Sequence, residues 1–395
     1  MESGSGFGGS SKYLSQLLAG LDRSRYDVRV VATQGGPAMT QIQSLGLPIH
    51  IEPLWRFPWG EPIWREADAR GRVSMCVDAL RAVVLGPVQA LIMVPRITVL
   101  LRRQRIHIVH LNNEVLSHVM VILAAKLAGC QVVCQLHGWR PFTRLERLMG
   151  WAVDVFVCTS QAGLQYYQAQ CTGRPLVAIP NGIVLNGRVA QAEAVRLPKR
   201  QSYGLQPEDI AVTILGRLVP WKGHQVFLNA LATVMRHNSR VVGLIIGHDP
   251  SPDQRHLLEL KQQAKALGIA GRIKCLPWED EAWAAFAAAD VIVHASTKPE
   301  PFGLVIVEAM AAGRPIIATR GGAVTDIIED GASGLIVEPG DANALSDAIR
   351  RLLDDRPLAG RMVEEARQRV RTLFSMERNI QQVCGVYDRL LGASL

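Results

Sequence analysis

The sequence predicts an α/β protein made of two Rossmann-like domains, and three observations support this fold class. The chain has 395 residues, which suggests two domains at roughly 100–200 residues each. Hydrophobic residues make up 48% of the chain and charged residues 20%, so there is enough apolar material for two cores. Short apolar runs alternate with helical patterns along the whole chain, which is typical of parallel sheets covered by helices.

In the first half, the helix expected over Lys12–Leu21 is accompanied by six apolar runs that read as strands. These expected strands are Val28–Thr33, Ile49–Pro53, Ile106–Leu111, Gln131–His137, Val155–Thr159 and Leu176–Ile179. A Rossmann-like half normally has a strand before its first glycine loop, but here the loop begins at Gly4. We therefore expect the first strand of this domain to be missing from the sequence, through a misassigned start codon or a truncation. The alternative is an atypical first strand.

The second half repeats the same alternation of strands and helices. The expected strands are Ala211–Leu215, Val242–Ile246, Ile273–Leu276, Val291–Ala295, Ile316–Thr319 and Gly334–Val337, and the expected helices include Gln225–His237, Gln254–Leu267 and Ala342–Leu353. Gly, Pro, Arg and Lys interrupt the periodicity between Asn186 and Gly204, which we interpret as the connection between the halves. The expected domains are residues 1–185 and 186–375, with a final amphipathic helix in 376–395 that crosses back to the first domain.

The composition excludes several classes of protein. The longest uncharged apolar stretch, Ala82–Pro95, is too short for a membrane span of about 20 residues, and Met1–Gly9 has no apolar core typical of a signal peptide. The seven cysteines lack the paired spacing of a metal site. We therefore expect a cytoplasmic protein with reduced thiols and no bound metal.

The net charge of +8 lies almost entirely in the first half, where 18 Lys and Arg face 11 Asp and Glu up to Leu185. No run of basic residues exceeds two, and no basic-aromatic platform is present, so a nucleic-acid partner is not expected. An anionic membrane surface or a phosphorylated substrate fits this charge equally well. The segment Ala79–Arg105 mixes apolar residues with arginines, and is either a core helix pair or an element that lies on anionic lipid.

Two glutamates form the most specific pattern in the chain. Glu300 lies in a Pro-flanked loop after a predicted strand, and Glu308 follows eight positions later among apolar residues. A helix beginning near Phe302–Gly303 would leave the backbone N–H groups of Phe302, Gly303 and Leu304 free to bind hydroxyl or phosphate groups. An unpaired carboxylate among apolar neighbours is costly, so we interpret Glu308 as a functional residue rather than a surface charge.

A second pattern, Gly216-Arg-Leu-Val-Pro-Trp-Lys-Gly223, follows directly on the strand Ala211–Leu215. Two cations at a strand-to-helix turn can neutralise a departing diphosphate. Together with the glutamate pair, this segment resembles the family-four retaining glycosyltransferases of the GT-B fold, with their E-x7-E signature (glycosyl transferases group 1). The resemblance covers nearly the whole chain.

The resemblance implies two domains facing across a cleft and a set of site residues. Arg217 and Lys222 would bind the donor diphosphate, Glu300 the transferred sugar and Glu308 the donor ribose. The glycine loop with Gly8 and Gly9 resembles the loop that approaches the diphosphate. His137 follows a strand at the position of the family's catalytic-site histidine, and Asn181-Gly182 resembles its interdomain hinge. The implied catalytic residues are His137, Glu300, Arg217 and Lys222.

The expected function is a retaining transfer of a sugar from a nucleotide diphosphate-sugar to a hydroxyl acceptor, without a metal or other cofactor. The acceptor class would be a glycan or a lipid-linked glycan, in the synthesis of a cell-surface polysaccharide. The expected location is cytoplasmic, with peripheral contact at the inner face of the membrane. A sugar-nucleotide epimerase or hydrolase, or a non-catalytic sugar-nucleotide-binding relative, is the alternative. Gly4, Gly6 and Gly9 have the spacing of a dinucleotide-binding motif. That motif requires a preceding strand and an acidic residue after the second strand, and the sequence has neither.

Overall fold

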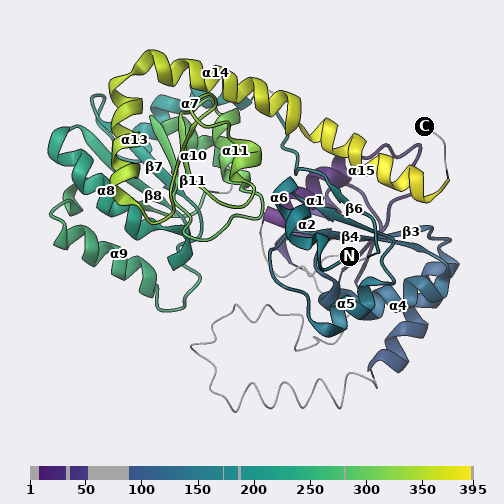
Figure 1. The fold of residues 1–395 in the computed structure, drawn as a ribbon. Coiled ribbons are helices and arrows are strands. Elements are labelled where there is room, and N and C mark those ends of the chain that lie inside the picture. Colours follow the sequence, from purple (N-terminus) through teal and green to yellow (C-terminus); the bar gives the residue numbers. More distant parts are fainter. Residues whose placement is uncertain are drawn as a thin grey trace, which may run out of the picture. The chain divides into compact units, whose positions relative to one another are not determined.

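A computed structural model describes residues 9–32, 36–51, 89–171, 173–185, 188–279 and 282–392 of the chain. The chain divides into two compact units (Figure 1). The first unit comprises Met1–Gly182 and Met376–Leu395, and the second comprises Ile183–Ser375. The boundary thus follows Gly182, three residues before the expected one, and the C-terminal segment belongs to the first unit.

The second unit contains a parallel sheet of six strands in the order β12-β11-β10-β7-β8-β9. The strands are β7 (Ile210–Leu215), β8 (Val241–Ile246), β9 (Ile273–Leu276), β10 (Val291–His294), β11 (Ile316–Thr319) and β12 (Leu335–Val337). The helices are α8 (His224–His237), α9 (Arg255–Ala266), α10 (Ala282–Ala288), α11 (Leu304–Ala311), α12 (Val324–Ile327), α13 (Ala342–Asp354) and α14 (Arg356–Leu373). Strands β7, β8 and β10 are almost wholly buried, as continuous apolar runs predict for a sheet covered on both faces.

The expected connection over Asn186–Gly204 is corrected by the structure, because most of it forms helix α7 (Arg188–Ser202) of the second unit. Arg196 and Arg200 of this helix are not solvated linker charges. Arg196 donates to the carbonyls of Ala287 and Ala289, at the C-terminal end of α10. Arg196 and Arg200 also bind Asp290. Cations are favourable at a helix C-terminus, where backbone carbonyls lack intrahelical donors, so the charges that interrupt the apolar pattern fix α7 in place.

The first unit contains a parallel sheet in the order β3-β4-β5-β6 and a separate parallel pair, β1-β2. The strands are β1 (Val30–Ala32), β2 (Ile49–Ile51), β3 (Ile108–Leu111), β4 (Gln131–Leu136), β5 (Val155–Cys158) and β6 (Leu176–Ala178). The helices are α1 (Gly9–Gly20), α2 (Pro37–Gln43), one over residues 89–103, α4 (Val119–Ala128), α5 (Arg144–Gly150) and α6 (Gln161–Gln168), with the 3-10 turn η1 at Val115–His118. The question of a missing first strand falls on residues before 9, outside the described ranges, and stays a prediction.

The C-terminal helix α15 (Met376–Leu390) packs on α1 within the first unit. Tyr13 donates a hydrogen bond from its hydroxyl to Asn379 Oδ1 (3.0 Å), and Tyr26 does the same to Asp388 Oδ1 (2.9 Å). Asn379 in turn donates to the carbonyl of Pro180. These buried polar contacts join the end of the chain to its beginning. Among the described helices, none is long and apolar enough to cross a membrane.

Candidate active site

The site residues of the second unit gather where the strand order of its sheet reverses. The chain runs outward from β7 through β8 to β9 and then returns to β10 on the other side of β7. The loops that follow β7 and β10 therefore diverge at one point, and ligands of open α/β sheets bind at such a switch point, beside the carboxyl ends of the strands. The first loop carries Arg217 and Lys222, and the second carries Glu300.

Backbone contacts hold these two loops against each other. The amide of Thr297 donates to the carbonyl of Trp221 at 2.7 Å. Gly223, at φ 74°, lies so close to the end of β10 that a Cβ there would stand 1.8 Å from the carbonyl oxygen of Ala295. Only glycine fits this position, both for its left-handed backbone and for the close approach. The separation of the two loops is thus fixed independently of their side chains.

Lys222 and Glu300 meet between these loops. Lys222 Nζ donates to Glu300 Oε2 at 2.6 Å, and both side chains are largely buried. Two further groups surround the same oxygen: His294 Nε2 at 3.1 Å and Ser296 Oγ at 3.2 Å. Lys222 also lies over the ring of Trp221, 4.2 Å from its centroid. Three donors that converge on one carboxylate oxygen hold it in a fixed orientation.

The surroundings of Glu300 keep it ionised. Burial alone would raise the pKa of this carboxyl, but the charge of Lys222 and the hydrogen bond from His294 lower it well below its ordinary value. The backbone of Glu300 is fixed as well, since its carbonyl accepts from Ala323 N at 2.9 Å. A Cβ at Gly322 would approach that carbonyl oxygen to 2.0 Å. Glu300 is therefore a preorganised acceptor of hydrogen bonds that is ionised near neutral pH.

Helix α11 begins beside this carboxylate, one residue later than expected. Gly303 precedes it at φ 93°, and the N–H groups of Gly303 and Leu304 have no acceptor within the helix because they lie at its start. The side chain of Phe302 belongs to the core, where its ring contacts Phe374 edge-on, so only its backbone could serve a ligand. Glu308 is 8% exposed on the same helix.

His137 lies in the first unit, directly after β4. Its Nε2 is 3.1 Å from Asn112 Oδ1, and Asn112 Nδ2 donates to the carbonyl of Ser10 in α1. With the amide in this orientation, Nε2 is the nitrogen that donates. Burial lowers the pKa of His137 to about 4, so this ring is neutral near pH 7. Gly9 is the first residue of α1.

The structure thus brings Lys222 and Glu300 into contact and places Arg217, exposed, on the same loop as Lys222. Gly8 lies outside the described residues. Sequence reasoning missed three polar residues that orient the predicted ones, and all three stand at strand ends: Asn112, His294 and Ser296. They could have been recognised in the sequence as polar residues at the ends of buried apolar runs, where ligands of parallel sheets bind.

Comparisons with known proteins agree with this architecture. Residues 195–369 match the family described as glycosyl transferases group 1, and residues 8–182 match the glycosyl transferase 4-like domain. The D-inositol 3-phosphate glycosyltransferase of Nocardioides sp. is 34% identical over 49% of this chain and 44% of its own length. The lipopolysaccharide core biosynthesis mannosyltransferase LpsB of Rhizobium meliloti is 27% identical over 54% and 62%. The chain thus spans about half the length of the curated relatives it matches.

A solved structure extends the likeness to the whole chain. The crystal structure of Anabaena Alr3699/HepE in complex with UDP and glucose covers 98% of both chains with a TM-score of 0.78 and 24% identity. At this identity the likeness shows the fold alone, and it confirms the predicted GT-B fold. The two matched families together account for most of both units. The chain therefore belongs to the group 1 glycosyltransferases.

Proposed function

We propose that this protein is a retaining glycosyltransferase that moves a sugar from a nucleotide diphosphate-sugar to a hydroxyl acceptor. The observation that carries the proposal is the contact of Lys222 with Glu300 at the switch point of the second unit. A cation and an ionised carboxylate side by side suit a donor whose diphosphate is anionic and whose sugar offers hydroxyl donors. The relatives named above act as glycosyltransferases, which supports the same class.

Each site residue has a role in this proposal. Lys222 and Arg217 bind the diphosphate and stabilise the charge that grows on it as the bond to the sugar breaks. Glu300 accepts hydrogen bonds from the sugar hydroxyls, and Glu308 accepts them from the ribose. The backbone N–H groups of Phe302, Gly303 and Leu304 bind oxygens of the donor. In the first unit, we assign His137 to contact with the transferred sugar and the Gly8-Gly9 loop to contact with the diphosphate.

The reaction keeps the configuration of the anomeric carbon of the transferred sugar. The bond from the anomeric carbon to the diphosphate oxygen breaks while a bond to the acceptor oxygen forms on the same face. The acceptor proton passes to the departing phosphate oxygen, so atoms and charge balance without a metal or a covalent intermediate. Since Lys222 is held by Glu300, the cation is already in place before the donor arrives, which avoids reorganisation during the reaction.

The donor class is tested by calorimetric titration of UDP- and GDP-sugars, with UDP-glucose first because the Anabaena neighbour was solved with UDP and glucose. Glu308→Gln keeps the shape of the side chain and removes its charge, so we expect it to weaken donor binding by about 1.5–3 kcal/mol. Affinity unchanged within about twofold would contradict the assignment of Glu308.

The reaction class is tested with a glycan or lipid-linked acceptor, by proton NMR of the anomeric configuration in the product. Retained configuration and activity that survives EDTA are expected. An inverted product, or activity that needs added Mg²⁺ or Mn²⁺, would contradict the mechanism. Equal turnover without any acceptor would favour the epimerase or hydrolase alternative, and donor binding without turnover would favour a non-catalytic relative.

A further inference from the structure

Helices α4 and α5 lie on the same face of the first unit's sheet. They connect β3 to β4 and β4 to β5, which are consecutive parallel neighbours. Right-handed crossovers that advance in one direction place their helices on one face, and Figure 1 shows α4 and α5 there. The helix over residues 89–103 borders α4, since Thr98 and Arg102 donate to its carbonyls at Ala124 and Leu127.

Large apolar side chains point outward from this helical layer. On α5 and its cap, Leu145, Leu148 and Trp151 follow one another at three-residue intervals and are 44%, 62% and 63% exposed. That spacing puts them on one side of the helix. On α4, Leu123 and Leu127 are spaced four apart and exposed as well. We call these five residues the α4–α5 face. Solitary exposed apolar residues are common, but stripes on two neighbouring helices mark an interaction site.

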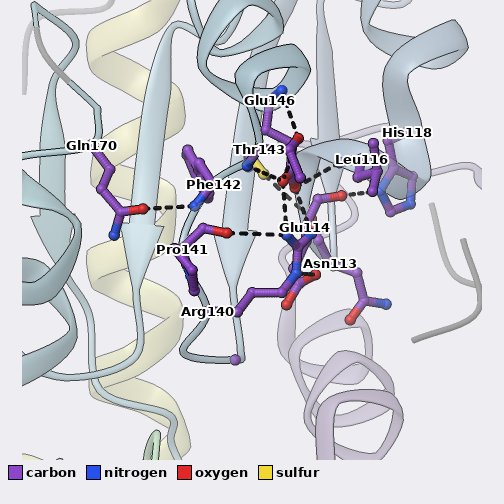
Figure 2. A network of polar contacts seen from close by, with 12 residues as sticks. Asn113, Glu114, Leu116, His118, Arg140, Pro141, Phe142, Thr143, Glu146 and Gln170 are labelled. Atoms are coloured by element: carbon purple, nitrogen blue, oxygen red, sulfur yellow. Dashed lines mark hydrogen bonds and ion pairs between the residues drawn. The ribbon is translucent and has the colours of Figure 1, made fainter. Parts of the chain in front are cut away.

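The charge around this face is predominantly positive. Residues 89–151 contain eight Lys and Arg and only two carboxylates. Both carboxylates, Glu114 and Glu146, are bound by the single guanidinium of Arg140 (Figure 2). Glu146 is fully buried. Of the remaining bases, Lys126 forms an ion pair with Asp154. The others include Arg102, Arg103, Arg105, Arg144 and Arg147.

On α5 itself the arginines alternate with the apolar residues. Arg144 and Arg147 are exposed and stand next to Leu145 and Leu148 in the sequence. Arg174 lies over the ring of Trp151, 5.6 Å from its centroid. Leucines and a tryptophan with arginines beside them match the boundary between acyl chains and head groups, where a long cationic side chain reaches the phosphates while its neighbours enter the apolar layer.

We propose that the α4–α5 face docks this protein onto an anionic lipid bilayer. The outward apolar stripes occur together with an excess of positive charge that includes the exposed Arg144 and Arg147. This combination favours an anionic bilayer, because burial of apolar side chains and attraction to anionic lipid each add to the binding. The surface differs from the site of the second unit, so the inference goes beyond the proposed catalytic function and can fail without it.

The apolar part of the proposal is tested by co-sedimentation of the full chain with phosphatidylcholine vesicles, with and without phosphatidylglycerol. Leu148→Gln/Trp151→Gln is expected to weaken partition onto anionic vesicles about tenfold or more. Leu258→Gln on α9, which removes a leucine that is 53% exposed in the second unit, is the matched control and should partition as the wild type does. Equal partition of the double variant and the wild type would overturn the proposal.

The charge is tested with Arg144→Gln/Arg147→Gln, for which we expect about a fivefold loss of partition per arginine at low salt and a weaker dependence on salt. Arg361→Gln/Arg371→Gln on α14 removes two exposed charges elsewhere and should have little effect. Wild-type binding that ignores lipid charge and salt, or no binding at all, would overturn the proposal. So would a dimer that forms without lipid and dissociates in Leu148→Gln/Trp151→Gln, since a second copy would then cover the face.

Discussion

The contact between Lys222 and Glu300 serves both stability and catalysis. The charge of Lys222 stabilises the buried carboxylate of Glu300, and in the proposed reaction it also binds the diphosphate. We expect Lys222→Met to lower kcat about 100-fold or more, since it removes charge stabilisation from the transition state. Donor affinity should fall less. The control is Lys265→Met, which removes an exposed charge on α9. A kcat within tenfold of the wild type would show that the diphosphate is held by other groups.

His294 is expected to position Glu300 rather than to touch substrate. It is 5% exposed, and its Nδ1 has no hydrogen-bond partner among the described residues, so Nε2 makes its only described polar contacts. His294→Ala should lower kcat about tenfold, the value of one hydrogen bond to a charged group. It should also raise the pKa of Glu300 and move the acid limb of the pH–rate profile upward. His294→Asn retains a donor and should recover part of kcat, whereas a profile identical to the wild type's would contradict this role.

The sequence predicted Glu300 and Lys222 because both belong to motifs with fixed spacing, but it could not predict His294, Ser296 or Asn112. His294 and Ser296 lie only six and four residues before Glu300, but they reach it through the fold of the loop after β10, which no regular periodicity describes. Asn112 reaches His137 from the neighbouring strand, 25 residues away. Neither an irregular loop nor a contact between neighbouring strands leaves a fixed spacing in the sequence by which to recognise the pair.

At the scale of elements, α5 is tied to the loop after His137 by the network in Figure 2. Arg140 binds Glu146 through two nitrogens and Glu114 through a third. Glu146 also accepts from the backbone of Thr143 and so closes the capping box of the helix. Burial alone would raise the pKa of Glu146, but the hydrogen bonds from Arg140 and Thr143 lower it. The guanidinium thus holds the loop together with two contacts from α6 and its C-terminal end, in which Tyr167 donates to the carbonyl of Gly138 and Gln170 accepts from the amide of Phe142.

Removing that guanidinium leaves a charge buried without its partner. We expect Arg140→Met to lower the free energy of unfolding of the first unit by about 3–5 kcal/mol, as measured by urea denaturation. Arg140→Met/Glu146→Met should recover part of the loss, because the apolar pair needs no counter-charge, whereas Glu114 still lacks its partner. Arg144→Met, exposed on the same helix, is the control. A double variant no more stable than Arg140→Met would mean that the capping role of Glu146 dominates.

Helix α7 shows where element prediction from the sequence failed. Its arginines and Pro198 interrupt the apolar periodicity, so the segment read as a connection. The helix is held instead by polar contacts to the end of α10, from Arg196 and Arg200. Periodicity detects helices that bury an apolar face, and it does not detect a helix whose polar groups bind the end of another.

For the whole molecule, the alternation of strands and helices was sufficient to predict two parallel α/β units, because each buried strand is a continuous apolar run. The alternation does not predict that the first unit is built from two separate stretches of the chain. Residues 376–395 join it through Tyr13 and Tyr26, whose partners Asn379 and Asp388 lie more than 360 residues away. The return of a final helix to the first domain was expected from the sequence, but the individual hydrogen bonds could come only from the structure.

Buried histidines make the stability of the whole chain depend on pH. Burial lowers the pKa of His110 and His224 to about 3 and that of His137 to about 4, whereas an unfolded histidine titrates near 6.5. Between about pH 4 and 6.5 the unfolded chain therefore binds more protons than the native one. Stability rises with pH in this window and is lost as the pH falls below 6.5, by up to about 1.4 kcal/mol per pH unit for each histidine.

His224 offers the sharpest test, because it is fully buried and neither of its ring nitrogens has a hydrogen-bond partner among the described residues. His224→Met removes a titrating group and an unsatisfied polar one, so the second unit should lose less stability between pH 6.5 and 4.5 than it does in the wild type. The stability at pH 7 should hold or increase, since a well-packed apolar group replaces unpaired nitrogens. His237→Gln, exposed on α8, should leave the pH dependence unchanged. Urea denaturation of the three proteins across this pH range measures the slopes, and a slope in His224→Met equal to the wild type's would show that the buried ring takes up no proton on unfolding in this window.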